Sequence, residues 1–207
     1  MSYTYPFRMC SATATMLAID PETKEIIIGV RSDTARMFPN CDSLPGGFME
    51  AKWEVGFLAT FKEWVAFILR KMADKLSNYP EHDNQESHPG ETLEETAIRE
   101  LREELSIIAA KEQLHLFDVR SNPRTDSRAH VVNACFWFEL TPMQSLALKA
   151  GDDLKDVKRI KIKDILDGNY KEHLAFNHSE ILMKGLKNYQ EHKEFLRFKE
   201  LKLEGVA

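Results

Sequence analysis

The pattern of apolar and polar positions in the first fifty residues predicts short strands joined by tight turns. Two apolar runs, residues 9–19 and 24–32, flank the turn-forming sequence Asp-Pro-Glu-Thr, and this arrangement is typical of a β-hairpin. Residues 44–50, LPGGFME, predict a strand end or a turn. Gly46 and Gly47 allow the backbone to approach another group closely there, because neither carries a side chain.

The middle of the chain changes to helical spacing. Residues 52–77 carry apolar side chains three or four positions apart and predict a helix, and residues 78–90 form a polar loop with two prolines. The helix also carries an aromatic stripe, made of Trp53, Phe57, Phe61, Trp64 and Phe67. We interpret this stripe as packing against its own domain or a dimer partner, with a substrate lid as the alternative. Charged residues interrupt the apolar run, so it is too short to span a membrane.

The second half alternates strands with helices. The predicted strands are residues 115–122, 130–140 and 157–165. A final helix begins at Asn177 with Glu180 and runs through about Tyr189, and residues 190–203 are its candidate continuation. Strands and helices mixed in this order predict an α/β (α+β) fold.

Composition limits the class of protein. The 207 residues, 43% hydrophobic and 29% charged, are typical of a globular chain of one domain. The net charge of −5 disfavours DNA and anionic membranes as partners. Three widely spaced cysteines (Cys10, Cys41 and Cys135) and the absence of a signal-peptide pattern predict reduced thiols and a cytoplasmic location. The seven histidines have no metal-ligand spacing, and we interpret them as incidental.

Residues 90–107 collect an unusual amount of negative charge on one predicted helix. Thr92 followed by Glu95 is a capping box that begins this helix. An apolar stripe recurs every fourth residue, at Leu93, Ala97, Leu101 and Leu105. Glu100, Glu103 and Glu104 lie together on another face, where like charges cost roughly 0.2–0.5 kcal/mol per pair, and Arg99 offsets part of that repulsion.

This acidic face has two interpretations. An ordinary helix run of this kind is a solvated face with its share of ion pairs. The alternative is a site for a hard divalent cation, because Mg²⁺ prefers a few carboxylates together with phosphate oxygens of the substrate.

The same residues resemble the box of the Nudix hydrolases, written G-x5-E-x7-R-E-U-x-E-E-x-G-U, with U bulky and aliphatic. From Glu91 the chain has seven residues and then RELREELSI, residues 99–107, so five charged and both aliphatic positions match. The glycine six residues before Glu91 is missing, but GGFME at 46–50 resembles the first half of the box. Joining Glu50 to Pro89 restores the motif, so residues 51–88 are identified as an insertion into a single Nudix domain of residues 1–207. Loop closure tolerates such length because its entropy grows only logarithmically.

The resemblance implies a fold and a set of roles. The fold is a mixed β-sheet sandwiched between helices, with an extra helical insertion. Glu100, Glu103 and Glu104 would be catalytic and metal-binding, the Gly47 carbonyl would be a further ligand, and Arg99 would orient Glu103 or Glu91. The metal would be Mg²⁺, with Mn²⁺ as an alternative. The base that activates water would be a box glutamate or one of three aspartates on a later segment: Asp152, Asp153 and Asp156.

The box has one further departure from the family pattern. Ser106 stands where the family has a glycine just past the helix. A left-handed conformation at a residue other than glycine costs roughly 1–2 kcal/mol, so we expect either a relaxed turn or tolerated strain. The consequence would be for stability rather than for chemistry.

Substrate residues are predicted downstream of the box and on the first strands. Pro123 lies sixteen residues after Ile107, as a proline does in ADP-ribose pyrophosphatases, and Arg128 matches an arginine of that group. Arg31 is a candidate phosphate ligand, because arginine binds oxyanions bidentately, with a surface charge as the equal alternative. Phe48 is a candidate base-stacking residue, with core packing as the alternative. Residues 176–182, FNHSEIL, also resemble the family's last-helix entry, F-D-H-A-E-I-L.

Two classes of function follow from the resemblance. The first is hydrolysis of the diphosphate bond in a nucleoside diphosphate linked to X, with ADP-ribose giving AMP and ribose 5-phosphate. NADH, nucleotide sugars, dinucleoside polyphosphates and capped RNA are the alternative substrates. The second is an ADP-ribose-sensing module that does not cleave its ligand. We expect the enzyme, because the box keeps its carboxylates and about eighteen residues after the last helix are too few for a DNA-binding domain. The expected partners are a small nucleotide and, as an open alternative, a second copy in a homodimer.

Overall fold

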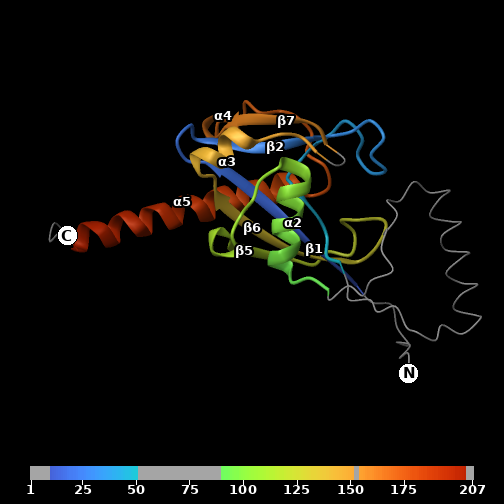
Figure 1. The fold of residues 1–207 in the computed structure, drawn as a ribbon, viewed down its shortest axis with the longest axis horizontal. Helices are drawn as coiled ribbons and strands as arrows, with labels where there is room; N and C mark the ends of the chain where they lie inside the picture. The colour runs from blue at the N-terminus through green and yellow to red at the C-terminus, as the bar shows by residue number, and fades with distance from the viewer. Residues whose placement is uncertain (1–9, 51–89, 152–153, 204–207) are drawn as a thin grey trace, which may run out of the picture. The chain divides into compact units, whose positions relative to one another are not determined.

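The computed structural model describes residues 10–50, 90–151 and 154–203 (Figure 1). The chain divides into two compact units, one formed by Met1–Met49 with Thr92–Ala207 and the other by Glu50–Glu91. The helix predicted at residues 52–77 lies outside the described residues. The organisation as a single domain with an insertion stays a prediction.

The first unit is built on a mixed β-sheet, as predicted from the sequence. Its central path runs in the order β3 (Asp42–Ser43), β2 (Glu25–Arg31), β1 (Ser11–Asp20), β6 (Val131–Glu139) and β5 (His115–Arg120). Two further strands, β4 (Gly46–Phe48) on β1 and β7 (Leu154–Lys161) on β2, complete it. The pairing of β1 with β6 is parallel and the other pairings are antiparallel.

The hairpin of β1 and β2 confirms the prediction for the first apolar runs. Ala18 pairs with Ile27, and Asp20 pairs with Glu25 at the turn. The Asp20 carboxylate accepts hydrogen bonds from the N–H groups of Glu22 and Thr23, each at 3.1 Å. An aspartate that bonds the backbone two or three residues later closes a tight turn, so local chemistry fixes this connection.

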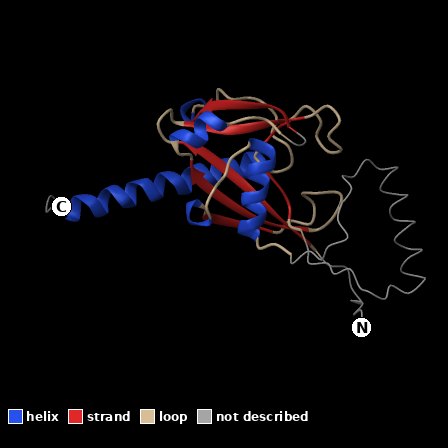
Figure 2. Ribbon diagram, viewed as in Figure 1, coloured by secondary structure: helices blue, strands red, loops and turns tan. Residues whose placement is uncertain are grey.

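Helices cover both faces of the sheet (Figure 2). Ala14, Met16 and Ala18 of β1 pack in one buried cluster with residues of α2 (Leu93–Leu105), whereas Leu17 and Ile19 pack in a second cluster with residues of α5 (His178–Leu203). Alternate residues of a strand point to opposite faces, so α2 and α5 lie on opposite sides of the sheet (Figure 1). A strand that is buried on both faces explains why the first apolar run is nearly continuous.

The acidic helix has the beginning and end that its sequence predicts. The Thr92 side chain accepts the Glu95 N–H at 3.2 Å, and the Glu95 carboxylate accepts the Thr92 N–H at 2.7 Å. At the other end Ser106 is left-handed, with φ 60° and ψ 26°. The Ser106 N–H donates to the Arg102 carbonyl at 3.1 Å, the bond of an αL cap, and the Ile107 N–H donates to the Leu101 carbonyl at 3.1 Å. The strain at Ser106 is therefore tolerated rather than relaxed.

Of the other helices within residues 10–50, 90–151 and 154–203, all but the last are short. They are η1 (Lys111–Gln113), α3 (Pro142–Ala147) and α4 (Ile162–Leu166). The strand predicted at residues 157–165 therefore ends at Lys161, where α4 takes over. The predicted final helix is confirmed and is continuous through the whole candidate extension. Among the helices described, none has the length and apolar content to cross a bilayer.

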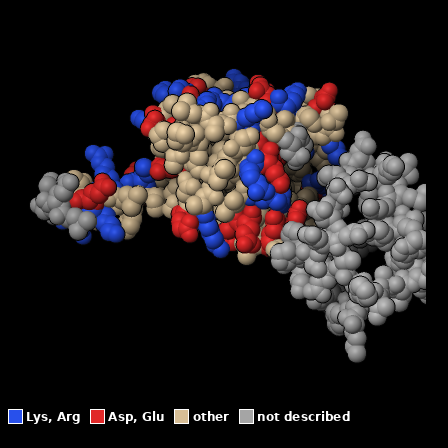
Figure 3. All heavy atoms as spheres, viewed as in Figure 1, with Lys and Arg blue, Asp and Glu red and all other residues tan. Residues whose placement is uncertain are grey.

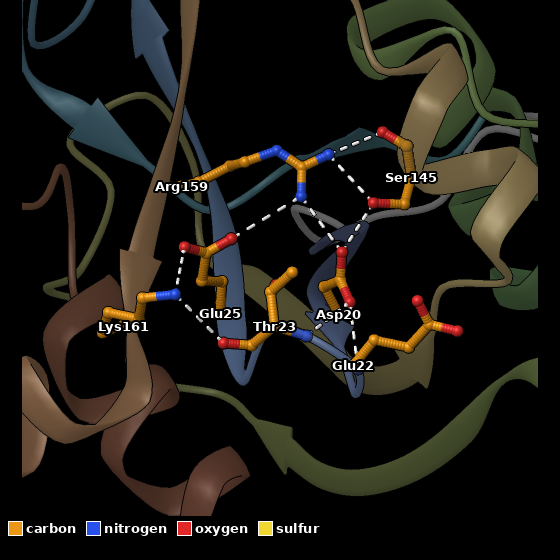
Figure 4. Close-up of polar contacts among 7 residues, drawn as sticks. All are labelled: Asp20, Glu22, Thr23, Glu25, Ser145, Arg159 and Lys161. Carbon is orange, nitrogen blue, oxygen red and sulfur yellow. Dashed lines mark hydrogen bonds and ion pairs between the residues drawn. The ribbon is translucent and has the colours of Figure 1, made fainter.

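A polar network ties α3 to the β1–β2 turn and to β7 (Figure 4). The Ser145 hydroxyl donates to the Asp20 carboxylate, and Nη1 of Arg159 donates to the same carboxylate at 3.0 Å. Nη2 of Arg159 donates to the Ser145 carbonyl at 2.6 Å. Burial alone would raise the pKa of Asp20, but the bonds from Ser145, the Thr23 N–H, Arg159 and the Glu22 N–H lower it to about 2. The network stabilises an ionised carboxylate that is almost fully buried.

Candidate active site

Strand β4 lies directly against two carboxylates of α2. The Gly46 N–H donates to Oε2 of Glu104 at 2.9 Å. At Gly47, the Glu100 carboxylate fills the place where a β-carbon would stand. A side chain at position 47 would therefore displace Glu100, which explains why this turn uses a glycine.

Arg99 connects the acidic face to the same strand. Nη1 donates to Oε1 of Glu100 at 2.8 Å and to Oε2 of Glu103 at 2.9 Å, and Nη2 donates to the Phe48 carbonyl at 2.9 Å. One guanidinium therefore holds two box glutamates and the backbone of β4 together. Of the two partners proposed for Arg99, Glu103 is in direct contact. Figure 3 shows acidic and basic side chains next to one another over α2.

The three glutamates differ in their exposure. Glu100 and Glu104 are only 7% and 4% exposed, whereas the Glu103 side chain is 39% exposed. Buried carboxylates are rare unless they are paired or hold a metal. Carboxylate oxygens of this kind are hard donors, which fit Mg²⁺ or Mn²⁺ in their chemistry, and the part of the Gly47 carbonyl as a further ligand stays a prediction. Across the described ranges no three acidic, histidine or cysteine side chains already converge on one point, and Arg99 occupies the space shared by Glu100 and Glu103.

The ends of the proposed insertion meet within the second unit. The Glu91 N–H donates to the Glu50 carbonyl at 3.0 Å, and the Glu50 N–H donates to Oε2 of Glu91 at 3.1 Å. Residues that are forty-one positions apart are thus hydrogen-bonded neighbours. This contact agrees with the interpretation that Glu50 and the start of the acidic helix belong to one interrupted motif.

An open pocket borders β4. Gly46, Gly47 and Phe48 form one part of its lining. Other lining residues come from β1, the loop before β6, β6 itself and the chain around the start of α5, and include Thr15, Asn122, Asp126, Asn133, Phe176 and His178. The same three residues of β4 thus border the pocket and contact Glu100, Glu104 and Arg99.

Of the four predicted substrate residues, three line the pocket and one does not. Arg31, Phe48 and Arg128 line the pocket. Pro123 is exposed in the loop between β5 and β6, whose Asn122 and Thr125 reach the lining. Their roles toward a substrate stay predictions.

The three aspartates proposed as a base are only partly described. Asp152 and Asp153 lie outside the described residues. Asp156 is exposed on β7, and its carboxylate accepts the N–H of Val157 at 2.8 Å. The bond is compatible with a structural role for Asp156.

Arg128 is held in a fixed orientation inside the pocket. Its Nη2 donates to Oδ2 of Asp126 at 2.7 Å, and Nε donates to Oδ1 at 3.0 Å. The hydrogen bonds from Arg128, together with its charge, keep the pKa of the buried Asp126 low despite desolvation. The guanidinium lies 4.9 Å from the ring centre of Phe48 and 5.6 Å from that of Phe176. The guanidinium is therefore within cation–π distance of two aromatic rings.

Sequence reasoning missed several residues of the pocket. Asp126, Asn133 and Phe176 carried no individual prediction, and His178 was interpreted as incidental along with the other histidines. The segment FNHSEIL contains both Phe176 and His178, so its resemblance to the family's last-helix entry was the signal that could have identified them.

Residues 86–182 match the model of the NUDIX domain. Over this segment the chain is similar to Nudix domains. A 93-residue segment is 36% identical to an ADP-ribose pyrophosphatase of Methanocaldococcus jannaschii, covering 45% of this chain and 48% of that protein. The chain thus spans about half the length of this curated relative.

Two solved structures share the fold. The NUDIX domain of Shewanella oneidensis NrtR, complexed with ADP ribose, has a TM-score of 0.58 at 17% identity and covers 90% of this chain and 94% of that one. A bifunctional NMN adenylyltransferase/ADP ribose pyrophosphatase of Francisella tularensis, complexed with AMP and a Mn ion, has a TM-score of 0.55 at 23% identity. It covers 89% of this chain and 43% of that one. The predicted Nudix fold, a mixed sheet between helices, is confirmed by these similarities.

Proposed function

We propose that this protein hydrolyses the diphosphate bond of a nucleoside diphosphate linked to a second group, and that ADP-ribose is its substrate. The oxygen of a water molecule would bond to one phosphorus while the bond from that phosphorus to the bridging oxygen breaks. AMP and ribose 5-phosphate would be released together with the protons of the water. The observation that carries the proposal is the contact of Glu100 and Glu104 with a strand that also borders an open pocket. The similarity to an ADP-ribose pyrophosphatase supports the choice of substrate.

The residues of the acidic face would have different roles. Glu100, Glu103, Glu104 and the Gly47 carbonyl would hold Mg²⁺, or Mn²⁺ in its place. Bound there, a divalent cation neutralises phosphate charge and lowers the pKa of a water molecule. Arg99 keeps Glu100 and Glu103 beside the Phe48 carbonyl, so the donor oxygens are held near the pocket before substrate arrives. A glutamate of the box would take the proton of the attacking water.

The pocket supplies the binding surface for the nucleotide. The Arg128 guanidinium, within cation–π distance of Phe48 and Phe176, would contact the base or sugar, and Arg31 would contact the phosphates. Arg31 donates through Nε to the Met37 carbonyl at 3.0 Å. That bond fixes the side chain, so its guanidinium is oriented before it meets an anion.

The decisive experiment is product analysis with the purified full chain. ADP-ribose, NADH, a nucleotide sugar and a dinucleoside polyphosphate would be incubated separately with Mg²⁺, with Mn²⁺ and with a chelator. We expect metal-dependent release of AMP and ribose 5-phosphate from ADP-ribose, faster than release of products from the others. Cleavage of another substrate alone would keep the reaction and discard ADP-ribose. Binding of ADP-ribose without cleavage under any metal would replace the enzyme with the sensing module.

A further inference from the structure

His178 is the first residue of α5, and it contributes a polar group to the pocket that the proposed reaction has not used. The residue is 9% exposed and lines the pocket together with its neighbour Asn177. Its ring is held by one bond, because the Leu44 N–H donates to Nδ1 at 3.0 Å. Leu44 begins the segment that leads into Gly46 and Gly47, so this bond links the start of α5 to the glycine turn.

The bond to Leu44 determines the protonation state of the ring. A nitrogen that accepts an N–H carries no proton, and an imidazolium has no acceptor nitrogen. His178 is therefore neutral, with its single proton on Nε2. Burial, and after it the positive charge of Arg31, lower its pKa to about 3, so the neutral form persists throughout the physiological range.

The Nε2–H group has no hydrogen-bond partner within the described part of the chain. A buried donor without a partner is unfavourable, and a native structure that keeps one calls for an explanation. Water or a ligand in the pocket is the simplest partner, because His178 borders that space. The His178 Nε2–H group is thus positioned to donate a hydrogen bond to an acceptor oxygen in the pocket.

The surroundings of His178 favour an anionic oxygen. The ring stands at the N-terminus of a 26-residue helix, where the helix dipole favours negative charge. Arg31 and Arg128 line the same pocket. Phe176, two residues earlier, has a φ of 53°, a left-handed conformation that an aromatic residue adopts only at a cost. Such strain concentrates at ligand sites, and here it accompanies an aromatic ring that borders the pocket.

We propose that His178 is a substrate-binding residue whose Nε2–H donates a hydrogen bond to a phosphate oxygen of the nucleotide in the pocket, while Nδ1 keeps Leu44 in place. The proposal rests on the proposed function, because it takes a nucleotide as the occupant of the pocket. It assigns to one histidine two separable tasks, one toward the ligand and one toward the fold. Because the ring stays neutral, the contact selects for a hydrogen-bond acceptor rather than for charge alone.

Two substitutions separate the two tasks. His178→Asn keeps an acceptor near the position of Nδ1 and removes the donor at Nε2. His178→Gln places an amide nitrogen near the position of Nε2 and removes the acceptor for Leu44. His173→Asn is the matched control, because His173 is exposed five residues upstream and does not line the pocket.

The measurement is binding by calorimetry without divalent metal, with ADP-ribose, AMP and ribose 5-phosphate as separate ligands, next to thermal unfolding of each variant. We expect His178→Asn to raise the Kd for ADP-ribose about tenfold or more, as for loss of a bond to a charged group, with little change in Tm. His178→Gln should lower Tm and keep more of the affinity. If His178→Asn weakens the binding of AMP, the hydrogen bond goes to the adenylate phosphate. If it weakens the binding of ribose 5-phosphate, the bond goes to the other phosphate.

The possible outcomes distinguish the proposed role of His178 from the proposed hydrolysis of ADP-ribose. If His178→Asn binds ADP-ribose within twofold of the unmodified protein while hydrolysis continues, His178 has only a structural role and the function stands. If affinity and Tm fall together in both variants, the ligand contact is likewise refuted. If ADP-ribose binds and His178→Asn weakens it, but no metal supports cleavage, the contact stands and the hydrolase is refuted. If the unmodified protein binds none of the three ligands, both proposals fail.

Discussion

The Glu100 carboxylate occupies the space that a β-carbon on Gly47 would need. The neighbouring Gly46 is constrained by a different group, because its β-carbon would overlap the carbonyl oxygen of Ala14 and its φ is 151°. A β-carbon at Gly47 would therefore meet a flexible side chain, whereas a β-carbon at Gly46 would meet fixed backbone.

This difference predicts opposite effects for two alanine substitutions. Gly47→Ala should push the Glu100 carboxylate aside and lower turnover about 100-fold, since displacements of about 1 Å in a site cost that much, while Tm changes little. Gly46→Ala should destabilise the fold by about 1–3 kcal/mol, because the backbone of β1 cannot yield easily. Turnover and denaturant unfolding of both variants test the pair. Equal losses of stability would show that Gly47 is a structural glycine and not part of the site.

Glu103 is the box carboxylate best suited to a test of chemistry apart from folding, because its side chain is 39% exposed. Glu103→Gln removes one charge and should lower turnover with ADP-ribose by about 100-fold or more, with unfolding unchanged. Arg99 would keep its bonds to Glu100 and to the Phe48 carbonyl. Glu94→Gln, on the same helix and paired with Lys111 at 3.8 Å, is the control and should stay fully active. A Glu103→Gln protein within a few-fold of the unmodified rate would remove Glu103 from the catalytic set.

The features that the sequence predicts correctly depend on residues close together in the chain. The acidic helix begins at Thr92 and ends before Ser106 because capping groups lie within three residues of each end. The join of Glu50 with Glu91 was predictable only through the family motif, since forty-one positions separate these residues.

The pocket wall could not be derived in this way. Arg128 contacts Phe48 and Phe176, and these three residues come from segments far apart in the chain. The spacing of residues within one segment does not predict contacts between segments. The partner of His178 is likewise a backbone group 134 positions away. A histidine examined alone in the sequence is therefore indistinguishable from an incidental one.

Asp20 predicts how stability depends on pH. Its pKa falls from 3.8 in the unfolded chain to about 2 in the folded protein, so its stabilising effect is fully present above about pH 4 and is lost as pH falls towards 2. The difference corresponds to about 2 kcal/mol at neutral pH. Asp20→Asn should lose this amount at pH 7 and show a flatter acid limb in urea unfolding.

The control for that experiment is Asp167→Asn, which removes an exposed partner of Lys163 and should change stability by less than about 0.5 kcal/mol. If Asp20→Asn unfolds with the same midpoint as the unmodified protein at pH 7 and at pH 3, the bonds of Ser145 and Arg159 to this carboxylate make no net contribution.

Ser106 offers a substitution that should increase stability. Its φ of 60° and ψ of 26° are left-handed, and the turn that follows α2 requires this conformation because the Ile107 N–H bonds back to the Leu101 carbonyl. Ser106→Gly removes the clash of the β-carbon, and we expect a gain of about 1 kcal/mol after the greater chain entropy of glycine in the unfolded state is counted. Ser106→Ala keeps the strain and removes only the hydroxyl, which donates to the Lys149 carbonyl at 3.4 Å, so it should bring no gain. Urea unfolding of both variants distinguishes the causes. A Ser106→Gly protein less stable than the unmodified one would mean that the bond to Lys149 outweighs the backbone strain.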